Sequence, residues 1–394
     1  MASVYIPCAI IGVEILKSRQ KMRTVINSIK NNAVLYISGL LAAVSCFFVI
    51  PDKEYIGYIN FKVLAILFCL MLIVAALVRI GTFDVLTGLL LRRISSHRGI
   101  SLLLTLLSFF LGMLLTNDVT LVTLVPFAIM VLSPFARKKE MMYTLIIMTV
   151  AANLGSMLTP IGNPQNLYLY ERYQISLPDF VLLMLPYSAL SLIIVIALVF
   201  ILIKGNGAAI APADQELSVI PKLKLIIYVA LFILNVLTVA GFIHFLISLA
   251  ATTVLVLILD RKSFPKVDYK LLLTFVFFFI LIGNIGRIDM ITNALEGLVT
   301  RYPVPASVLS SQIISNVPAA MLLSAFTENG KALVIGTNLG GLGTIIASMA
   351  SLITYRFHSA IPEEQKSGSF LLAFSVINIV TLALLFGLFM IIGR

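Results

Sequence analysis

A run of glycines, prolines and uncharged polar residues interrupts one of the long apolar stretches of the sequence. It reads Gly155-Ser-Met-Leu-Thr159-Pro-Ile-Gly162-Asn163-Pro164-Gln-Asn166. Proline removes backbone donors and glycine loosens a helix. Carbonyl groups then become free to bind a cation, and the N-terminus of the following half-helix becomes free to bind an anion. The run therefore predicts an ion-binding break in a helix. The alternative is a kinked helix whose polar groups are satisfied by its neighbours.

Two other apolar stretches carry a polar tip near the middle. Ile100–Val131 is interrupted by Thr116-Asn117-Asp118, and Ala306–Phe326 by Ser315-Asn316-Val317-Pro318. A membrane-spanning helix takes about 20 apolar residues, so each half is expected to be too short to span comfortably. We predict two re-entrant hairpins, over residues 99–133 and 303–326, whose tips lie inside the membrane.

Asp118 is the acidic residue at the middle of a hairpin, and an ionisable group at that depth is a functional candidate. Two roles are open: it binds a coupling cation or a proton, or it caps the helix expected to start at Val119. Capping explains Asn117 and Asn316 equally well, and Pro318 suits the first turn of the half-helix that follows.

These motifs lie in a strongly apolar chain. Of its 394 residues, 60% are hydrophobic and 11% are charged, and the mean hydropathy is +1.08. This composition excludes a soluble domain and predicts an all-α polytopic membrane protein with about 10 transmembrane helices plus the two hairpins. The predicted spans are Ser3–Leu16, Ala33–Ile50, Val63–Ile80, Met141–Tyr170, Leu177–Ile203, Leu225–Ile243, Phe245–Leu259, Leu271–Ile285, Ala332–Tyr355 and Phe370–Ile392.

The charge distribution favours the hairpins. The chain has 28 Lys and Arg against 17 Asp and Glu, and basic residues collect in cytoplasmic loops. If both hairpins return to the side they entered, Arg98 and Arg137–Lys139 share the cytoplasmic side with most other basic residues, and both termini are external. Topology therefore explains the positive charge, and no nucleic-acid partner is needed.

Other kinds of chemistry have little support. The three cysteines show no CxxC spacing, and His97, His244 and His358 are scattered, so neither a disulfide framework nor a metal site is expected. We find no grouping of nucleophile, base and metal ligand, which argues against an enzyme, and we expect no resident cofactor.

Three short motifs of the first half of the chain recur in the second half in the same order. Gly81-Thr-Phe-Asp-Val-Leu-Thr matches Gly286-Arg-Ile-Asp-Met-Ile-Thr, the hairpin tips follow, and Asn153-Leu-Gly matches Asn338-Leu-Gly. We predict a first repeat at 1–204, a cytoplasmic linker at 205–224 and a second repeat at 225–394. An odd number of spans inverts the second copy, so hairpin 99–133 opens inward and hairpin 303–326 outward.

Inverted repeats with broken helices are the architecture of secondary transporters, whose substrate lies near the membrane midplane. The expected site is where the two tips meet the two Asn-Leu-Gly segments. The second copy lacks the prolines of the first, so we expect asymmetric binding. The segments Gly81–Leu91 and Gly286–Leu298 are expected to be short amphipathic helices along the membrane surface.

The chain resembles the ion transporter superfamily, specifically the citrate-transporter-like permeases, which include divalent-anion/sodium symporters, arsenite permeases and sodium/proton antiporters. Gly162-Asn-Pro-Gln-Asn166 resembles the G-T-P-P-N signature of the dicarboxylate symporters, and the two tips resemble their paired S-N-T motifs. Neither tip has the final Thr, and the second half has no G-T-P-P-N.

The resemblance implies two cation sites, one from Thr116, Asn117 and the backbone of Gly162, the other from Ser315, Asn316 and the region of Ala347. It places the anion between Asn117, Asn163 and Asn316. Asp118 is an additional candidate cation ligand. Further candidate substrate contacts in the same segments are Thr159, Pro164, Asn166 and Thr344. The resemblance also implies a homodimer with an elevator-type transport domain.

The sequence thus predicts a secondary active transporter in the cytoplasmic membrane. Its expected cargo is a small anion, a di- or tricarboxylate such as citrate or succinate, coupled to Na⁺ or H⁺. Within transport, the alternatives are a cation/proton antiporter that uses Asp118 and an arsenite-type permease. A channel and a polytopic membrane enzyme are the alternatives outside it.

Overall fold

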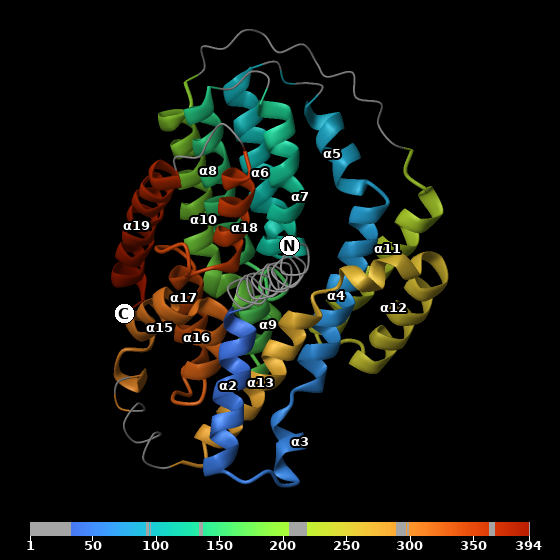
Figure 1. Ribbon diagram of the computed structural model, residues 1–394, viewed down its shortest axis with the longest axis vertical. Helices are drawn as coiled ribbons and strands as arrows, with labels where there is room; N and C mark the ends of the chain where they lie inside the picture. The colour runs from blue at the N-terminus through green and yellow to red at the C-terminus, as the bar shows by residue number, and fades with distance from the viewer. Residues whose placement is uncertain are drawn as a thin grey trace, which may run out of the picture. The chain divides into compact units, whose positions relative to one another are not determined.

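The computed structural model describes residues 33–91, 94, 96–133, 137–204, 219–288, 297, 299–361 and 367–393 (Figure 1). Throughout these residues the chain forms helices and connecting segments, without a strand. The predicted span Ser3–Leu16, most of the linker and most of Gly286–Leu298 lie outside the described residues.

The first half contains α2 (Ala33–Phe48), α3 (Glu54–Tyr58), α4 (Phe61–Arg79), α5 (Thr82–Leu91), α6 (His97–Leu115), α7 (Asn117–Leu132), α8 (Lys138–Ser156), α9 (Pro164–Arg172) and α10 (Leu177–Leu202). The second half contains α11 (Lys222–Val239), α12 (Phe245–Asp260), the 3-10 helix η1 (Arg261–Lys266), α13 (Tyr269–Ile285), α15 (Pro303–Ile314), α16 (Asn316–Leu323), α17 (Gly330–Gly340), α18 (Met349–Ser359) and α19 (Ser367–Ile392). Seven of the described predicted spans are single helices, with shifts of a few residues at their ends. The predicted spans Met141–Tyr170 and Ala332–Tyr355 are instead each broken into two helices, α8 with α9 and α17 with α18.

Several helices are suited to a bilayer. Among the described residues, five are long and apolar enough to cross a membrane, or six if α12 and α13 are counted together as one span. The helical membrane protein is therefore confirmed, and the count of about 10 spans stays a prediction. The five helices include α6, which has 19 residues, so the expectation that each hairpin half is too short is wrong for α6. It starts early because the Ser96 side chain accepts a hydrogen bond from the Gly99 backbone N–H at 3.1 Å.

Both predicted tips are breaks between two helices. Thr116 has φ 75° and ψ 148°, and Ser315 has φ 73° and ψ 156°. A positive φ is uncommon for residues other than glycine, and it persists only where the surrounding structure holds it in place. Helix α7 begins at Asn117, not at the expected Val119, so Asp118 lies in its first turn and Thr116 is the cap residue. The negative charge of Asp118 is favourable there because the helix dipole is positive at its N-terminus.

The chain divides into two compact units. One comprises the described part of Met1–Ile59 together with Asp268–Arg287. In this unit α2 packs closely on α13, because Gly39 lies against the Phe277 ring, and Asn284 donates to Ser45 Oγ at 2.8 Å. Such polar contacts between helices are typical of membrane interiors.

The other unit comprises Asn60–Val267 and Ile288–Arg394 and contains both hairpins. In Figure 1, α6, α7, α8 and α10 run side by side in this unit. Small residues allow the closest approach, since a Cβ on Gly155 of α8 would lie 1.9 Å from the Phe109 carbonyl oxygen of α6. A glycine is therefore required at this crossing.

Candidate functional site

Two helices of the larger unit are interrupted where the Asn-Leu-Gly segments end. Residues 157–163 separate α8 from α9, and residues 341–348 separate α17 from α18. The residue before each following helix is extended: Asn163 has φ −143° and ψ 145°, and Ser348 has φ −137° and ψ 138°. Glycine is needed at 162, because a Cβ there would lie 2.1 Å from the Ser156 carbonyl oxygen. The run of glycines and prolines thus breaks the helix where the sequence predicts.

The first tip joins the break of the other half of the chain. Asn117 Nδ2 donates to Asn153 Oδ1 at 2.7 Å and to Ser348 Oγ at 3.5 Å. Ser348 Oγ donates to the same Asn153 oxygen at 3.0 Å. All three side chains are buried. This triad connects α7, α8 and the start of α18.

A second buried group lies around Ser156. Asn163 Nδ2 donates to Ser156 Oγ at 2.6 Å, and Asn166 Nδ2 donates to the Ser156 carbonyl oxygen at 3.2 Å. Asn338 Nδ2 donates to Asn166 Oδ1 at 2.7 Å. Ser156 Oγ in turn donates to the Asn153 carbonyl oxygen at 2.8 Å, which links this group to the triad. We call the combined set, Asn117, Asn153, Ser156, Asn163, Asn166, Asn338 and Ser348, the polar cluster.

The second tip reaches the same break as the first. The Asn316 backbone N–H donates to the Ala347 carbonyl oxygen at 3.0 Å, and Ser315 Oγ donates to it at 3.3 Å. The two tips therefore contact consecutive residues, Ala347 and Ser348. In this conformation the Ala347 oxygen already accepts two hydrogen bonds, which fill its two lone pairs.

Positive ends of helix dipoles gather around the polar cluster. Asn117 and Asn316 are the first residues of α7 and α16, and Asn163 and Ser348 precede α9 and α18. Each helix N-terminus carries a partial positive charge and backbone N–H groups without intrahelical partners. Every side chain of the polar cluster is itself uncharged. The arrangement can stabilise an anion without an Arg or Lys.

Some buried polar atoms of this region have no hydrogen-bond partner among the described residues. They are Asn153 Nδ2, Asn163 Oδ1, Gln165 Oε1, Gln165 Nε2 and Asn338 Oδ1. A buried polar group left without a partner costs about 1–3 kcal/mol. Such groups mark places where a ligand or an ordered water would be stabilised.

The remaining predicted site residues are not members of the polar cluster. Thr159 Oγ1 donates to the carbonyl oxygen of Met113, near the end of α6, at 2.5 Å. The same oxygen accepts from the Gly162 N–H at 3.1 Å, so Thr159 connects Gly162 to α6. Pro164 is the first residue of α9. Thr116 and Asp118 are half-buried. Thr344 is exposed, and its N–H donates to Gln312 Oε1 at 2.9 Å. Their roles in binding stay predictions.

The prediction from sequence omitted several cluster members. Asn153, Ser156, Asn338 and Ser348 were not named as ligands, and neither was Gln165. Asn153 and Asn338 could have been found, because both open the repeated Asn-Leu-Gly segments. Ser348 carries no comparable signal in the sequence. No group of three or more His, Cys, Asp or Glu side chains that could hold a metal ion occurs in the described parts of the chain.

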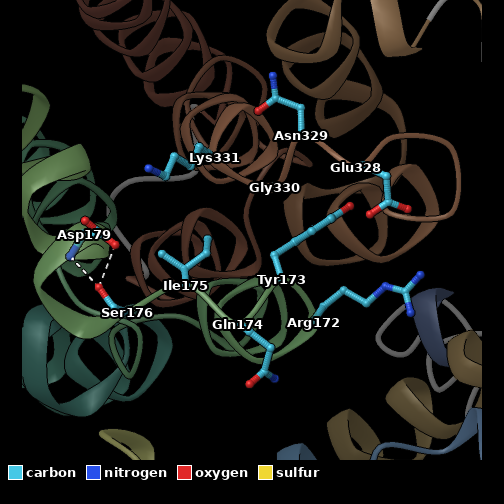
Figure 2. Close-up of a pocket in the computed structure, with 10 residues that line it drawn as sticks. All are labelled: Arg172, Tyr173, Gln174, Ile175, Ser176, Asp179, Glu328, Asn329, Gly330 and Lys331. Carbon is cyan, nitrogen blue, oxygen red and sulfur yellow. Dashed lines mark hydrogen bonds between the residues drawn. The ribbon is translucent and has the colours of Figure 1, made fainter.

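A pocket of about 770 Å³ opens at the other end of α9. Figure 2 shows Arg172 and Glu328 on one side and Asp179 and Lys331 on the other, with Tyr173 between them. Tyr173 Oη donates to the Thr327 carbonyl oxygen at 2.7 Å, which joins the segment after α9 to the segment before α17. Helix α9 has nine residues, or about 13 Å, so the pocket and the polar cluster are separate.

A helical membrane protein with broken helices around a buried, uncharged polar cluster has the features of a membrane transporter. The chain belongs to the citrate transporter family (CitMHS), which matches residues 22–330. The family resemblance predicted from the motifs is thereby confirmed. The protein is a membrane-embedded transporter of this family.

Individual relatives agree with this membership. The chain is 34% identical to an uncharacterized transporter of Methanocaldococcus jannaschii over 86% of this chain and 91% of the relative. It is 30% identical to the inner membrane protein YbiR of Escherichia coli over 80% of this chain and 86% of the relative. A silicon efflux transporter of Oryza sativa is 31% identical over 36% of this chain and 28% of the relative.

Proposed function

We propose that the protein is a secondary active transporter that moves a small anion, a di- or tricarboxylate such as citrate or succinate, together with Na⁺ or H⁺. The observation that carries this proposal is the polar cluster, in which Asn117, Asn163 and Ser348 mark the starts of three helices. A carboxylate at this point would accept hydrogen bonds from amide and hydroxyl groups and interact with the positive helix ends.

The proposed position of the coupling ion is near the tips of the two hairpins. Asp118 is half-buried in the first turn of α7, next to Asn117 of the cluster. A cation or proton held by Asp118 would offset the negative charge of the bound anion. The second proposed cation position is at Ser315, Asn316 and Ala347, where the carbonyl oxygen would have to exchange a hydrogen bond for the ion.

The proposed mechanism is elevator-type alternating access in a homodimer, with two inverted repeats. Two similarities support the repeats: Thr116 and Ser315 share their backbone dihedrals, and so do Asn163 and Ser348. Asn163 and Ser348 also follow Asn153 and Asn338 at the same distance along the chain.

Thermal stability of the purified protein tests the proposal. It would be measured in detergent with citrate, succinate, malate, sulfate, phosphate or arsenite, each in Na⁺ and in choline at two pH values. A ligand of the folded state raises apparent stability by mass action. We expect one carboxylate to stabilise the protein only with Na⁺ or only at the lower pH, and uptake into liposomes to require the same pair.

Two variants test whether the carboxylate that stabilises the protein binds at the polar cluster. Asn117→Ala and Asn163→Ala should each remove the stabilisation by the carboxylate. Asn235→Ala is the matched control, because Asn235 is also a buried asparagine but bonds Thr252 between α11 and α12. It should keep the response to the ligand even if its own stability falls.

A cation/proton antiporter is the second candidate, and the position of Asp118 at the start of α7 is what favours it. A response to Na⁺ and pH without a response to any anion would put the antiporter first. Asp118→Asn separates the two functions: an antiporter would lose exchange, whereas a symporter that uses backbone and hydroxyl ligands would keep substrate binding. A response to arsenite alone would favour the arsenite-type permease.

A further inference from the structure

Gln165 is a buried amide whose hydrogen-bonding groups are unused. Only 1% of its surface is exposed. Within the described residues, neither Oε1 nor Nε2 has a hydrogen-bond partner. No other residue of the polar cluster region has both ends of its side chain in this state. A buried donor and a buried acceptor without partners each carry a desolvation cost, so a leucine would be the more stable residue at this position.

The neighbours of Gln165 along the chain are parts of the polar cluster. It lies in the first turn of α9 between Asn163 and Asn166, which both bond Ser156. One turn later on the same helix face, Tyr168 Oη bonds Ser324 Oγ at the end of α16, at 2.7 Å. This face of α9 is thus turned toward α16 inside the unit.

The equivalent position after the second helix break, between α17 and α18, has no amide. Ala350 follows Ser348 at the same distance as Gln165 follows Asn163. Ala350 is packed in an apolar cluster with Leu121 and Leu124 of α7. Helix α16, which packs against α9, carries the small buried residues Ala319 and Ala320. The interface of α7 with α18 is closed by apolar side chains, whereas that of α9 with α16 contains an amide.

The unpartnered atoms define what a ligand must supply. Three are acceptors, namely Asn163 Oδ1, Gln165 Oε1 and Asn338 Oδ1. A carboxylate only accepts hydrogen bonds and would leave all three oxygens unsatisfied. A hydroxyl group both donates and accepts, so it matches an amide that offers a donor and an acceptor together.

We infer that Gln165 hydrogen-bonds a hydroxyl group of the substrate, so that the transporter selects hydroxylated carboxylates over carboxylates of the same shape without a hydroxyl. This inference rests on the proposed function and names the substrate class within it. A site built to hydrogen-bond a substrate hydroxyl discriminates strongly against the analogue that lacks it, because its own buried groups are then left unpaired.

Two substrate pairs that differ by one hydroxyl test the inference. Malate is compared with succinate, and citrate with tricarballylate, by ligand-induced thermal stabilisation of the full-length protein in Na⁺. For the wild-type protein we expect the hydroxylated member of at least one pair to bind at least about tenfold more tightly. In Gln165→Leu this preference should disappear, while binding of the member without a hydroxyl is retained or strengthened.

The apparent melting temperature without ligand shows whether the variant is folded. A loss of the hydroxyl preference can then be separated from misfolding. Gln165→Leu should have an apparent melting temperature equal to or above that of the wild type, because the substitution removes buried unpaired groups. The matched control is Asn378→Leu: Asn378 in α19 is also a buried amide with an unpartnered oxygen. It should leave the hydroxyl preference unchanged.

The possible failures are distinguishable. If the wild-type protein binds carboxylates without preferring the hydroxylated member, or if Gln165→Leu weakens both members equally, the inference is overturned and the proposed function stands. Equal weakening would assign Gln165 to the coupling cation or to the carboxylate. If no carboxylate binds the wild type at all, the proposed function itself fails.

Discussion

Gly155 is the residue at which two helices of the larger unit come into backbone contact. A Cβ at this position would lie 1.9 Å from the Phe109 carbonyl oxygen, and a backbone atom cannot move aside as a side chain can. The contact also lies two residues from Asn153, so its geometry fixes the start of the polar cluster.

We expect Gly155→Ala to destabilise the protein by about 2 kcal/mol or more, because α6 and α8 must separate. The measurement is the apparent melting temperature in detergent. Gly387→Ala in α19 is the control, since apart from the adjacent residues and the backbone of its own helix no atom lies within 4 Å of the added methyl group. It should be neutral or stabilising, because alanine is the better helix former. Equal melting temperatures of the two variants would contradict the close approach.

Asn153 is the acceptor that joins the tip of the first hairpin to the second half of the chain. We expect Asn153→Ala to reduce substrate affinity at least about tenfold, because Asn117 and Ser348 both lose their partner. Binding is measured by ligand-induced stabilisation, with Asn235→Ala as the matched control. Unchanged affinity would show that the triad is structural only.

The ion pair between Lys62 and Glu171 links the start of α4 to the end of α9. Lys62 Nζ lies 2.8 Å from Glu171 Oε2, and the Glu171 side chain is only 4% exposed. Removing one partner of a buried pair leaves an uncompensated charge, which is more costly than losing both. Because Lys62 is partly exposed, solvent reduces the effect.

We expect Lys62→Met to lower the apparent melting temperature, and Lys62→Met combined with Glu171→Gln to recover most of the loss. A double-mutant cycle that includes Glu171→Gln alone gives the coupling between the two residues. Additive effects of the single variants would mean that the pair contributes nothing by itself.

Just after α13, Arg287 forms an ion pair with Asp52 in the smaller unit. Arg287 donates to Asp52 Oδ2 at 2.8 Å, and this hydrogen bond holds the pKa of the Asp52 carboxyl below its usual value. A carboxyl whose pKa is lowered by folding contributes stability above its unfolded pKa, which is about 3.9. That contribution is lost as the pH falls through the folded pKa.

We therefore expect the apparent melting temperature of the wild type to fall more than that of Asp52→Asn between about pH 6 and pH 3. The difference should be small, since the side chains of Arg287 and Asp52 are 39% and 38% exposed and are screened by solvent, and high salt should reduce it further. Parallel pH curves for the two proteins would show that the interaction does not stabilise the unit.

At the scale of the whole molecule, the two re-entrant hairpins that we propose predict a membrane topology. If α6 and α7 return to the side they entered, Ser96 and Ser133 lie on the same face of the membrane, the cytoplasmic one. If the second repeat is inverted, Tyr302 and Glu328 lie together on the external face. All four side chains are exposed and therefore accessible to a reagent.

Cysteine labelling from either side of intact cells checks this topology, in a background without Cys8, Cys46 and Cys69. We expect Ser96→Cys and Ser133→Cys to react only after permeabilisation, and Tyr302→Cys and Glu328→Cys to react without it. Labelling of Ser96 and Ser133 from opposite sides would make α6 and α7 separate spans and would contradict the inward-opening hairpin.

The sequence by itself determined the helical membrane class, the positions of most helices and the breaks at the tips and after the Asn-Leu-Gly segments. These features are local, because apolar length, glycine, proline and capping residues act within a few positions of the chain. The early start of α6 at His97 was missed, since a single serine cap carries a weak signal. The family could likewise be predicted from short motifs.

Only the tertiary structure decided which polar residues meet. Asn117 bonds Ser348, and Asn338 bonds Asn166, over sequence separations of 231 and 172 residues. Every asparagine has the same donor and acceptor groups, so its type cannot identify its partner. The packing of α7 with α18 and of α9 with α17 makes that choice, and Gln165 is left without a partner among the described residues. These contacts depend on close packing between distant helices, which no local pattern specifies.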